Sequence, residues 1–131
     1  MTPFAIAGIG VDVVPFARIE RLISEHEARL SRVFTVRERT FCDGAAGVRR
    51  IARYAAAFAA KEAVMKSLGT GWRSDVEWCD IDTLPVGPTG EIRLLGAAAG
   101  VAAAQSVARI LVSTASASGA AFATAVAERH A

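Results

Sequence analysis

A predicted helix from about Val48 to Leu68 does most to limit the folds open to this chain, because its apolar stripe needs a core or another subunit to cover it. Gly69 follows as a typical helix stop. Both lysines of the chain, Lys61 and Lys66, fall in this helix, whereas the other thirteen basic residues are arginines. Glu62 lies four residues before Lys66, so these two side chains share one face of the helix.

Glu62 also lies on the apolar stripe of this helix. Phe58 and Ala59 precede it by one turn, and Met65 follows it by three residues. A carboxylate in such surroundings needs a partner, and a metal ion is one candidate. An ordinary Glu-Lys pair on the helix surface is the alternative, and the helix alone does not choose between the two.

Composition fits one globular domain. The chain has 131 residues, of which 53% are hydrophobic and 21% are charged, so it can bury a core. Its net charge of +2 is too small to indicate nucleic-acid binding. Cys42 and Cys79 are too few for a disulfide framework, and we expect both to be reduced and buried in a cytoplasmic protein. The apolar N-terminal segment has no preceding basic residue and contains Asp12, which argues against a signal peptide.

The stretch from Ile110 to Ala127 has no charged residue and approaches the length of a membrane span. Serine, threonine and glycine residues interrupt it, however. Two buried strands, Arg109–Ala115 and Ala120–Ala127, joined by a turn at Ser116–Gly119, explain the pattern better, and we expect no association with a membrane.

Alternation of small and branched residues predicts a strand from Ala5 to Val14. Period two places Ile6, Gly8, Gly10 and Asp12 on one face. The two glycines leave room for another group to approach the backbone beside Asp12.

Sequence patterns in the rest of the chain predict short helices and strands. In order, they are a helix after Pro15, a helix from the capping box Thr35-Val36-Arg37-Glu38 to about Cys42, a strand at Val76–Leu84, a strand at Glu91–Leu95 and a helix at Ala97–Ser106. Helices and strands mix without a βαβ rhythm. We therefore predict an α+β fold in which a mainly antiparallel sheet packs on the long helix.

Three motifs occur in order: Gly8-Ile9-Gly10-Val11-Asp12, Phe58-Ala59-Ala60-Lys61-Glu62-Ala63-Val64-Met65-Lys66 and Gly69-Thr70-Gly71. At this spacing they resemble the holo-acyl-carrier-protein synthase family, the small type of 4′-phosphopantetheinyl transferase. Arg32–Glu38 and Asp80–Asp82 resemble two further family segments, so the resemblance covers nearly the whole chain. It implies a single domain over residues 1–131 with the family's α+β fold, and a homotrimer with active sites between subunits.

The resemblance also implies an activity, the Mg²⁺-dependent transfer of the 4′-phosphopantetheine arm of coenzyme A to a serine of an apo acyl carrier protein. Asp12 and Glu62 match the two metal carboxylates of the family, and Lys66 matches its phosphate-contacting lysine, so these three are the implied catalytic residues. The nucleophile belongs to the partner protein. Metal-bound water or a nearby carboxylate is the expected base, since no histidine falls at a suitable place.

Further site residues come from the same resemblance. The coenzyme A set comprises Arg49, Arg50, Arg53, Lys61, Lys66, Gly69, Thr70 and Gly71. Lys61 either contacts coenzyme A or stays solvated; Arg49 and Arg50 are otherwise a solvated pair, and the glycine turn is otherwise a helix cap. The carrier-protein set comprises Arg18, Arg21 and Leu22, whose alternative is a solvated helix face.

The chain departs from the family pattern at two positions. Ala57 replaces an arginine and Ser116 replaces a histidine, both on the coenzyme A side, and Arg53 lies one turn before Ala57. Two alternatives follow: a non-catalytic carrier-binding or scaffold homologue, and an unrelated small-molecule-binding domain in which Glu62 and Lys66 form a surface pair. The resemblance leaves open whether the carrier protein serves fatty-acid or polyketide synthesis.

Overall fold

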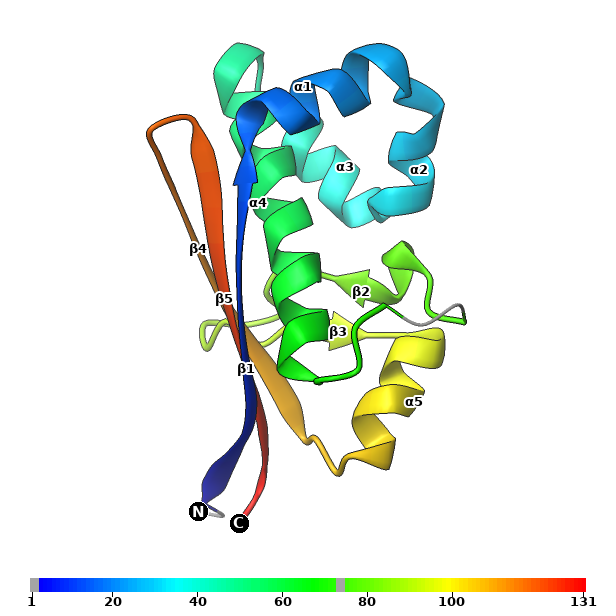
Figure 1. The fold of residues 1–131 in the computed structure, drawn as a ribbon, viewed down its shortest axis with the longest axis vertical. Helices are drawn as coiled ribbons and strands as arrows, with labels where there is room; N and C mark the ends of the chain where they lie inside the picture. Colours follow the sequence, from blue (N-terminus) through cyan, green and yellow to red (C-terminus); the bar gives the residue numbers. More distant parts are fainter. Residues whose placement is uncertain (1–2, 73–74) are drawn as a thin grey trace.

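A computed structural model describes residues 3–72 and 75–131. Its centre is the long helix α4 (Gly47–Ser67), which lies along one face of a three-stranded antiparallel sheet (Figure 1). The strand order is β1 (Phe4–Pro15), β5 (Ala120–His130), β4 (Arg109–Ala117). The two chain ends lie together, since β1 pairs antiparallel with β5 along its length. The predicted helix and the three predicted strands are present, but β4 continues to Ala117 and is exposed from Ser113 onward, so the prediction of a buried strand ending at Ala115 is wrong in these two respects.

The uncharged stretch near the C-terminus forms the β4–β5 hairpin. Its two-residue turn is Ser118-Gly119, with φ of 53° and 73°, the backbone that favours tight hairpins. Within residues 3–72 and 75–131, no helix is both long and apolar enough to cross a membrane.

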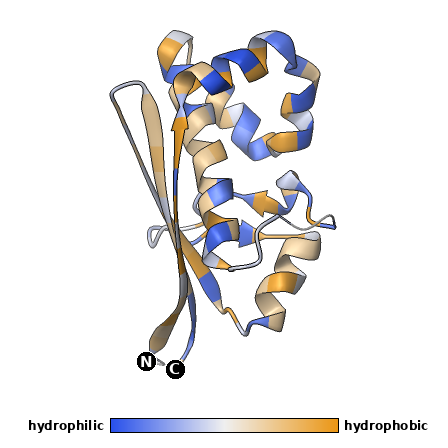
Figure 2. Ribbon diagram, viewed as in Figure 1, coloured by the Kyte–Doolittle hydropathy of each residue, from blue (hydrophilic) through white to orange (hydrophobic). Residues whose placement is uncertain are grey.

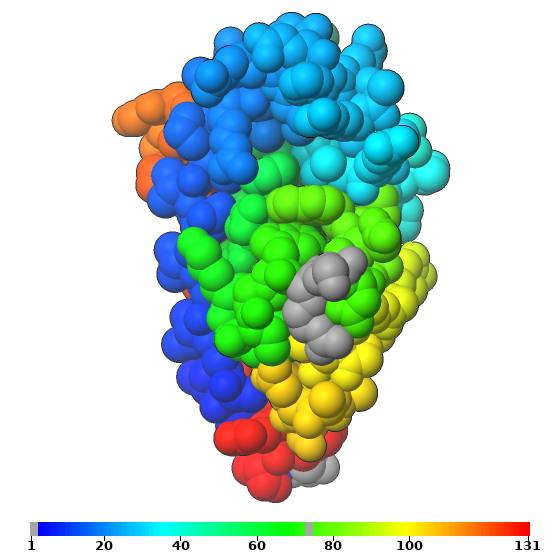
Figure 3. All heavy atoms as spheres, turned by 45° about the vertical axis from the view of Figure 1, so that its right-hand side comes forward, coloured from blue at the N-terminus to red at the C-terminus, as the bar shows by residue number. Residues whose placement is uncertain are grey.

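Shorter elements surround the two ends of α4. They are α1 (Phe16–Glu25), η1 (Glu27–Arg29), α2 (Leu30–Val33), α3 (Val36–Asp43), η2 (Trp78–Asp80), β2 (Ile81–Asp82), β3 (Arg93–Leu94) and α5 (Gly96–Ala104). Helices α1 to α3 gather at one end of the molecule and α5 lies toward the other (Figures 1 and 3). Strands β2 and β3 pair antiparallel as a second small sheet. The α+β class is therefore confirmed.

Local signals fix the helix ends. Thr35 caps α3: the Glu38 backbone N–H donates to Thr35 Oγ1 at 3.1 Å, and the Thr35 N–H donates to Glu38 Oε1 at 2.8 Å. Pro15 stands at the N-cap of α1. Gly69 follows the end of α4 with φ of 71°, a conformation that glycine adopts without strain. The capping box and the stop predicted from sequence are both confirmed.

The predicted strand from Val76 to Leu84 is wrong in extent, because only Ile81–Asp82 is a strand. The Asp80 carboxylate accepts a hydrogen bond from the Glu77 backbone N–H at 3.1 Å and turns this segment into a short 3₁₀ helix. The predicted strand at Glu91–Leu95 likewise shrinks to β3, with Glu91 forming a single bridge to Leu111.

A bulge interrupts β1 between Ile6 and Gly8. Beyond it, Gly10 and Val14 are buried toward α4, whereas Ile6 is 61% exposed. The prediction that Ile6 shares the face of Gly8 is therefore wrong, because an extra residue in a strand reverses the alternation.

Small residues bring the sheet and α4 into close contact. A Cβ added to Gly8 would lie 1.9 Å from the Ser67 carbonyl oxygen, and one added to Gly10 would lie 1.9 Å from that of Ala63. The neighbouring face of β5 is equally small and fully buried, with Ala121, Ala123, Ala125 and Ala127. The group that approaches the β1 backbone at the glycines is thus the helix itself.

The opposite face of the sheet is apolar and exposed. It carries Ile9, Val11 and Val13 from β1 and Phe122 from β5, and Figure 2 shows much of β1 coloured as hydrophobic. An uncovered apolar face of this kind marks an interaction surface.

Candidate active site

Asp12 lies on the face of β1 that looks toward α4. Two residues of a strand advance about 6.6 Å, and four residues of a helix advance about 6 Å. Gly8 accordingly lies against Ser67, and Gly10, two residues later on β1, lies against Ala63, one turn earlier on α4. The next step places Asp12 beside the turn of α4 that carries Glu62.

Lys66 joins the strand to the helix at this point. Its Nζ donates to Asp12 Oδ1 and to the Val11 carbonyl oxygen, both at 3.0 Å. The Lys66 side chain is 53% exposed and that of Asp12 is 18% exposed. The ammonium therefore holds the Asp12 carboxylate while its third N–H can meet a ligand from solvent.

Glu62, one turn before Lys66, has a different partner. The indole Nε1–H of Trp72 donates to Glu62 Oε2 at 3.1 Å. Sequence reasoning missed Trp72; its position directly after Gly69-Thr70-Gly71 was the available signal. The glycine turn brings the chain back toward α4 and places the indole beside the carboxylate.

The two carboxylates suit a hard cation. Asp12 Oδ1 and Glu62 Oε2 are held by N–H donors, which leaves one oxygen of each side chain without a hydrogen bond among the described residues. In that part of the chain no group of three or more His, Cys, Asp or Glu could hold a metal ion alone. One or two carboxylates completed by substrate phosphates and water is the donor set typical of Mg²⁺.

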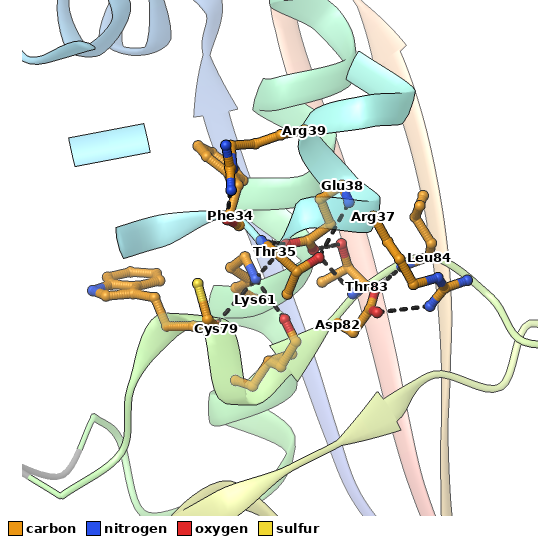
Figure 4. Close-up of polar contacts among 12 residues, drawn as sticks. Phe34, Thr35, Arg37, Glu38, Arg39, Lys61, Cys79, Asp82, Thr83 and Leu84 are labelled. Atoms are coloured by element: carbon orange, nitrogen blue, oxygen red, sulfur yellow. Dashed lines mark hydrogen bonds and ion pairs between the residues drawn. The ribbon is translucent and has the colours of Figure 1, made fainter. Parts of the chain in front are cut away.

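Lys61 does not belong to this site, and the prediction that it contacts coenzyme A or stays solvated is wrong. Its side chain is 0% exposed. Figure 4 shows its amine between Glu38 and backbone carbonyls: Nζ lies 2.8 Å from Glu38 Oε1, 3.1 Å from the Trp78 oxygen and 2.5 Å from the Ile81 oxygen. All three N–H donors of the amine are thus used.

Glu38 is the centre of this buried network. Its Oε1 accepts from the Thr35 N–H in the α3 cap, and its Oε2 accepts hydrogen bonds from the backbone N–H and the hydroxyl of Thr83. The network joins α3, α4 and the start of β2 in one place. Sequence reasoning assigned Glu38 only to the capping box, because nothing local indicates a lysine twenty-three residues later as its partner.

The arginines in the first half of α4 have different surroundings. Arg50 pairs with Asp43 at 2.9 Å and lies over the Tyr54 ring, 5.2 Å from its centroid. The Tyr54 hydroxyl donates to the same Asp43 oxygen at 2.8 Å. Burial, followed by that hydrogen bond, raises the pKa of Tyr54, and the hydrogen bond is the largest cause of the lowered pKa of Asp43. Arg49 is exposed beside the β4–β5 turn.

Arg53 lines a cavity of about 260 Å³ between α3, α4 and β4. Its Nη1 donates to the Phe41 carbonyl oxygen at 2.7 Å, and its guanidinium lies over the Phe41 ring at 4.2 Å. Ala57 and Ser116 line the same cavity. The two positions that depart from the family pattern and the nearby arginine therefore meet at one place.

The turn after α4 is open. Gly69 and Gly71 both have positive φ, and a Cβ on either would meet nothing within 4 Å. Thr70 is exposed, and its hydroxyl donates to the Gly71 carbonyl oxygen at 3.3 Å. Backbone N–H groups in such a turn can bind an anionic ligand, besides ending the helix.

The face expected to meet the carrier protein forms a shallow hollow on α1. Arg18, Arg21 and Leu22 line it together with Phe58 of α4. The Arg18 guanidinium lies over the Phe58 ring, 4.7 Å from its centroid. The predicted carrier-binding residues are thus neighbours around Phe58, which lies one turn before Glu62 on α4.

Both cysteines are free thiols. Cys42 is buried as expected, whereas Cys79 is only partly buried, so that part of the prediction is wrong. Burial, then the nearby Glu38 and Asp43 charges, raise the pKa of the Cys42 thiol to about 12.

Comparison with known proteins gives a consistent result. A family model described as the 4′-phosphopantetheinyl transferase superfamily matches residues 8–125. A holo-[acyl-carrier-protein] synthase of Anaeromyxobacter dehalogenans is 44% identical over 109 residues, which cover 80% of this chain and 82% of that protein.

Solved structures agree with this match. The holo-[acyl-carrier-protein] synthase of Neisseria meningitidis has a TM-score of 0.75 and 30% identity, covering 95% of this chain and 100% of that one. The Bacillus anthracis holo-(acyl-carrier-protein) synthase, solved in complex with CoA (3′,5′-ADP), has a TM-score of 0.69 and 27% identity, covering 95% and 97%.

Proposed function

The chain belongs to the 4′-phosphopantetheinyl transferase superfamily, and we propose that it works as a Mg²⁺-dependent holo-acyl-carrier-protein synthase. It transfers the 4′-phosphopantetheine arm of coenzyme A to a serine of an apo acyl carrier protein. The observation that carries the proposal is the pair of carboxylates on β1 and α4, with Lys66 donating to Asp12 at 3.0 Å.

The reaction is a phosphoryl transfer. The carrier serine oxygen forms a bond to the phosphorus that bears the pantetheine, and the bond from that phosphorus to the bridging oxygen breaks. The bridging oxygen leaves with its electron pair as part of adenosine 3′,5′-bisphosphate, while the serine proton passes to a base. Positioning and charge stabilisation are what a protein contributes to such a transfer.

Asp12 and Glu62 are the residues that would hold Mg²⁺. When bound, the ion supplies positive charge to the diphosphate oxygens. Lys66 keeps the Asp12 carboxylate in place and offers its remaining N–H to the transferred phosphoryl group as a point charge. The histidines of the chain, His26 and His130, stand at the end of α1 and at the end of β5, so we assign the base to a carboxylate near the reacting phosphorus.

The nucleotide end of coenzyme A is assigned to the α3–α4 side. Arg53 lines the cavity there, and Arg49 is exposed near the start of α4. Arg50 is already paired with Asp43, which makes it the weaker candidate. The exposed glycine turn at Gly69–Gly71 would offer backbone donors to the pantetheine or the diphosphate.

The acyl carrier protein is assigned to the α1 hollow. Two arginines, Arg18 and Arg21, line it beside Leu22 and Phe58 and outnumber its one acidic residue, Glu25, a combination suited to an acidic helical partner. Phe58 in this hollow lies one turn before Glu62 on α4, so a carrier bound there would bring its serine toward the carboxylates.

We further propose that copies of this chain assemble as a homotrimer through the outer face of the sheet. The exposed Ile9, Val11, Val13 and Phe122 support an interface of strand faces. Free Cys42 and Cys79 thiols support a reducing, cytoplasmic setting.

One experiment tests the proposed function. The protein is incubated with Mg²⁺, coenzyme A and several apo carrier proteins, and carrier mass is read by mass spectrometry. We expect one phosphopantetheine unit to be added, and the gain to disappear with a chelator. Carrier binding without a mass gain would favour a scaffold homologue, as the loss of arginine at Ala57 suggests; absence of both binding and modification would contradict the proposal.

A further inference from the structure

The indole of Trp72 contacts the proposed metal carboxylate without neutralising it. Its Nε1–H donates to Glu62 Oε2 at 3.1 Å, and an indole has only this one donor. The other carboxylate of the pair, Asp12, is held by the ammonium of Lys66. Among the residues that the structure describes, one carboxylate is therefore held by a cation and the other by a neutral donor.

The Trp72 ring is itself fixed in a column of stacked groups. Its centroid lies 4.0 Å from that of Trp78, and Trp78 lies 5.0 Å from Phe58. The Arg18 guanidinium also lies over the Phe58 ring, 4.7 Å from its centroid. This aromatic column, defined by Trp72, Trp78, Phe58 and Arg18, runs from Glu62 to helix α1, and aromatic and cation–π contacts of this kind give each ring a preferred place.

A fixed indole limits the freedom of Glu62. A free glutamate side chain samples many rotamers, and ordering it costs conformational entropy. The hydrogen bond holds Oε2 and leaves Oε1 for a cation. Carboxylates that bind metals are commonly oriented by such an outer hydrogen bond, and losing it typically weakens metal binding about 10- to 100-fold.

We propose that Trp72 is a positioning residue that holds Glu62 in the geometry for cation binding, with the aromatic column as its support. The inference rests on the proposed function, since it takes Glu62 as a cation ligand. The glycine turn Gly69–Gly71 would then have two roles. It ends α4, and it places the Trp72 indole beside Glu62.

The test compares two single substitutions in the full chain with coenzyme A present. Trp72→Phe keeps an aromatic ring and removes the N–H, whereas Trp78→Phe changes a ring of the same column that does not bond Glu62. The dissociation constant of Mn²⁺ is measured from the free-ion signal in electron paramagnetic resonance. We expect about a tenfold or greater weakening for Trp72→Phe and less than a twofold change for Trp78→Phe.

Fluorescence gives an independent reading. In the Trp78→Phe protein the only remaining indole is Trp72. We expect its emission to shift when Mg²⁺ is added with coenzyme A, and to stay unchanged when Glu62→Gln is also present. This reading does not need the Trp72→Phe protein to fold, so it tests the contact even if that variant is unstable.

The outcomes separate the two proposals. Tight Mn²⁺ binding by Trp72→Phe, together with weak binding by Glu62→Gln, overturns the role of Trp72 and leaves the proposed function standing. Binding by Glu62→Gln equal to that of the unsubstituted protein overturns the cation site, and the role of Trp72 with it. An emission that does not respond to Mg²⁺ in the Trp78→Phe protein also contradicts the positioning role.

Discussion

Gly10 of β1 lies against the Ala63 carbonyl oxygen of α4, and a Cβ at Gly10 would stand only 1.9 Å from that oxygen. This contact sets the spacing between strand and helix at one fixed point. Asp12 is two residues further along the strand, and Glu62 is one residue before Ala63. The spacing between the two carboxylates therefore depends on the absence of a side chain at Gly10.

Gly10→Ala should disturb this spacing. The added methyl group meets the backbone of α4 at Ala63 and Ser67, so either the strand or the helix must move, and we expect a loss of about 3 kcal/mol in the free energy of unfolding. Urea denaturation measures it. Gly100→Ala is the matched control, because a Cβ there meets nothing within 4 Å in helix α5, and it should stabilise the protein by about 0.5–1 kcal/mol. Equal effects of the two substitutions would refute the close contact.

The two lysines should separate stability from activity. Lys61→Met leaves the Glu38 carboxylate buried without its partner, and we expect a loss of about 3–5 kcal/mol in the free energy of unfolding. Lys66→Met removes a half-exposed pair, so its effect on stability should stay below about 1 kcal/mol. Its transfer rate should fall about a hundredfold, because a charge at the phosphoryl group is lost. Urea titration and a carrier-mass assay measure the two effects.

The contrary result for the lysines is equally clear. If Lys66→Met transferred the arm at a normal rate, Lys66 would have no part in the reaction. If Lys61→Met unfolded at the same urea concentration as the unsubstituted protein, the buried network around Glu38 would not hold α3 and α4 together.

Arg53→Gln should weaken binding of the nucleotide end of coenzyme A. A hydrogen bond from a charged group contributes about 1.5–3 kcal/mol, so we expect KM for coenzyme A to rise roughly 10- to 100-fold with little change in kcat. The 3′-dephospho form of coenzyme A serves as the control substrate, and its KM should not respond. An equal rise for both substrates would place Arg53 away from the 3′-phosphate.

Alkaline pH should reveal the buried thiol of Cys42. Its pKa is raised to about 12 in the folded protein against an ordinary value of 9.0, so the folded state keeps a proton that the unfolded chain releases. The stability it contributes is intact below pH 9 and declines as pH rises toward 12. Between pH 8 and pH 10.5 the unsubstituted protein should lose about 2 kcal/mol relative to Cys42→Ala. Parallel stability curves for the two proteins would contradict this.

Sequence patterns were enough for the parts of the fold that local interactions decide. The capping box at Thr35 and Glu38 and the stop at Gly69 depend on neighbouring residues, so they could be predicted. The true extent of the strand predicted at Val76–Leu84 could not be predicted, because the Glu77 backbone N–H donates to the Asp80 carboxylate and this bond competes with extended structure. The bulge before Gly8 has no local sequence mark of its own.

In the candidate site, too, some residues could be predicted from sequence motifs and others could not. Asp12, Glu62 and Lys66 follow from motif order, and the contact from Lys66 to Asp12 agrees with it. Lys61 was assigned wrongly, because its partner Glu38 is brought near only by tertiary packing. Trp72 was missed for the same reason, since its bond to Glu62 spans the turn after α4.

The most direct measurement is a crystal structure of the protein with coenzyme A and Mn²⁺, with the ion located by its anomalous scattering. We expect one ion bound to an oxygen of Asp12, an oxygen of Glu62 and the diphosphate of coenzyme A, and the Glu62→Gln protein should lose it. An ion bound without either carboxylate, or the same ion retained by the Glu62→Gln protein, would contradict the account.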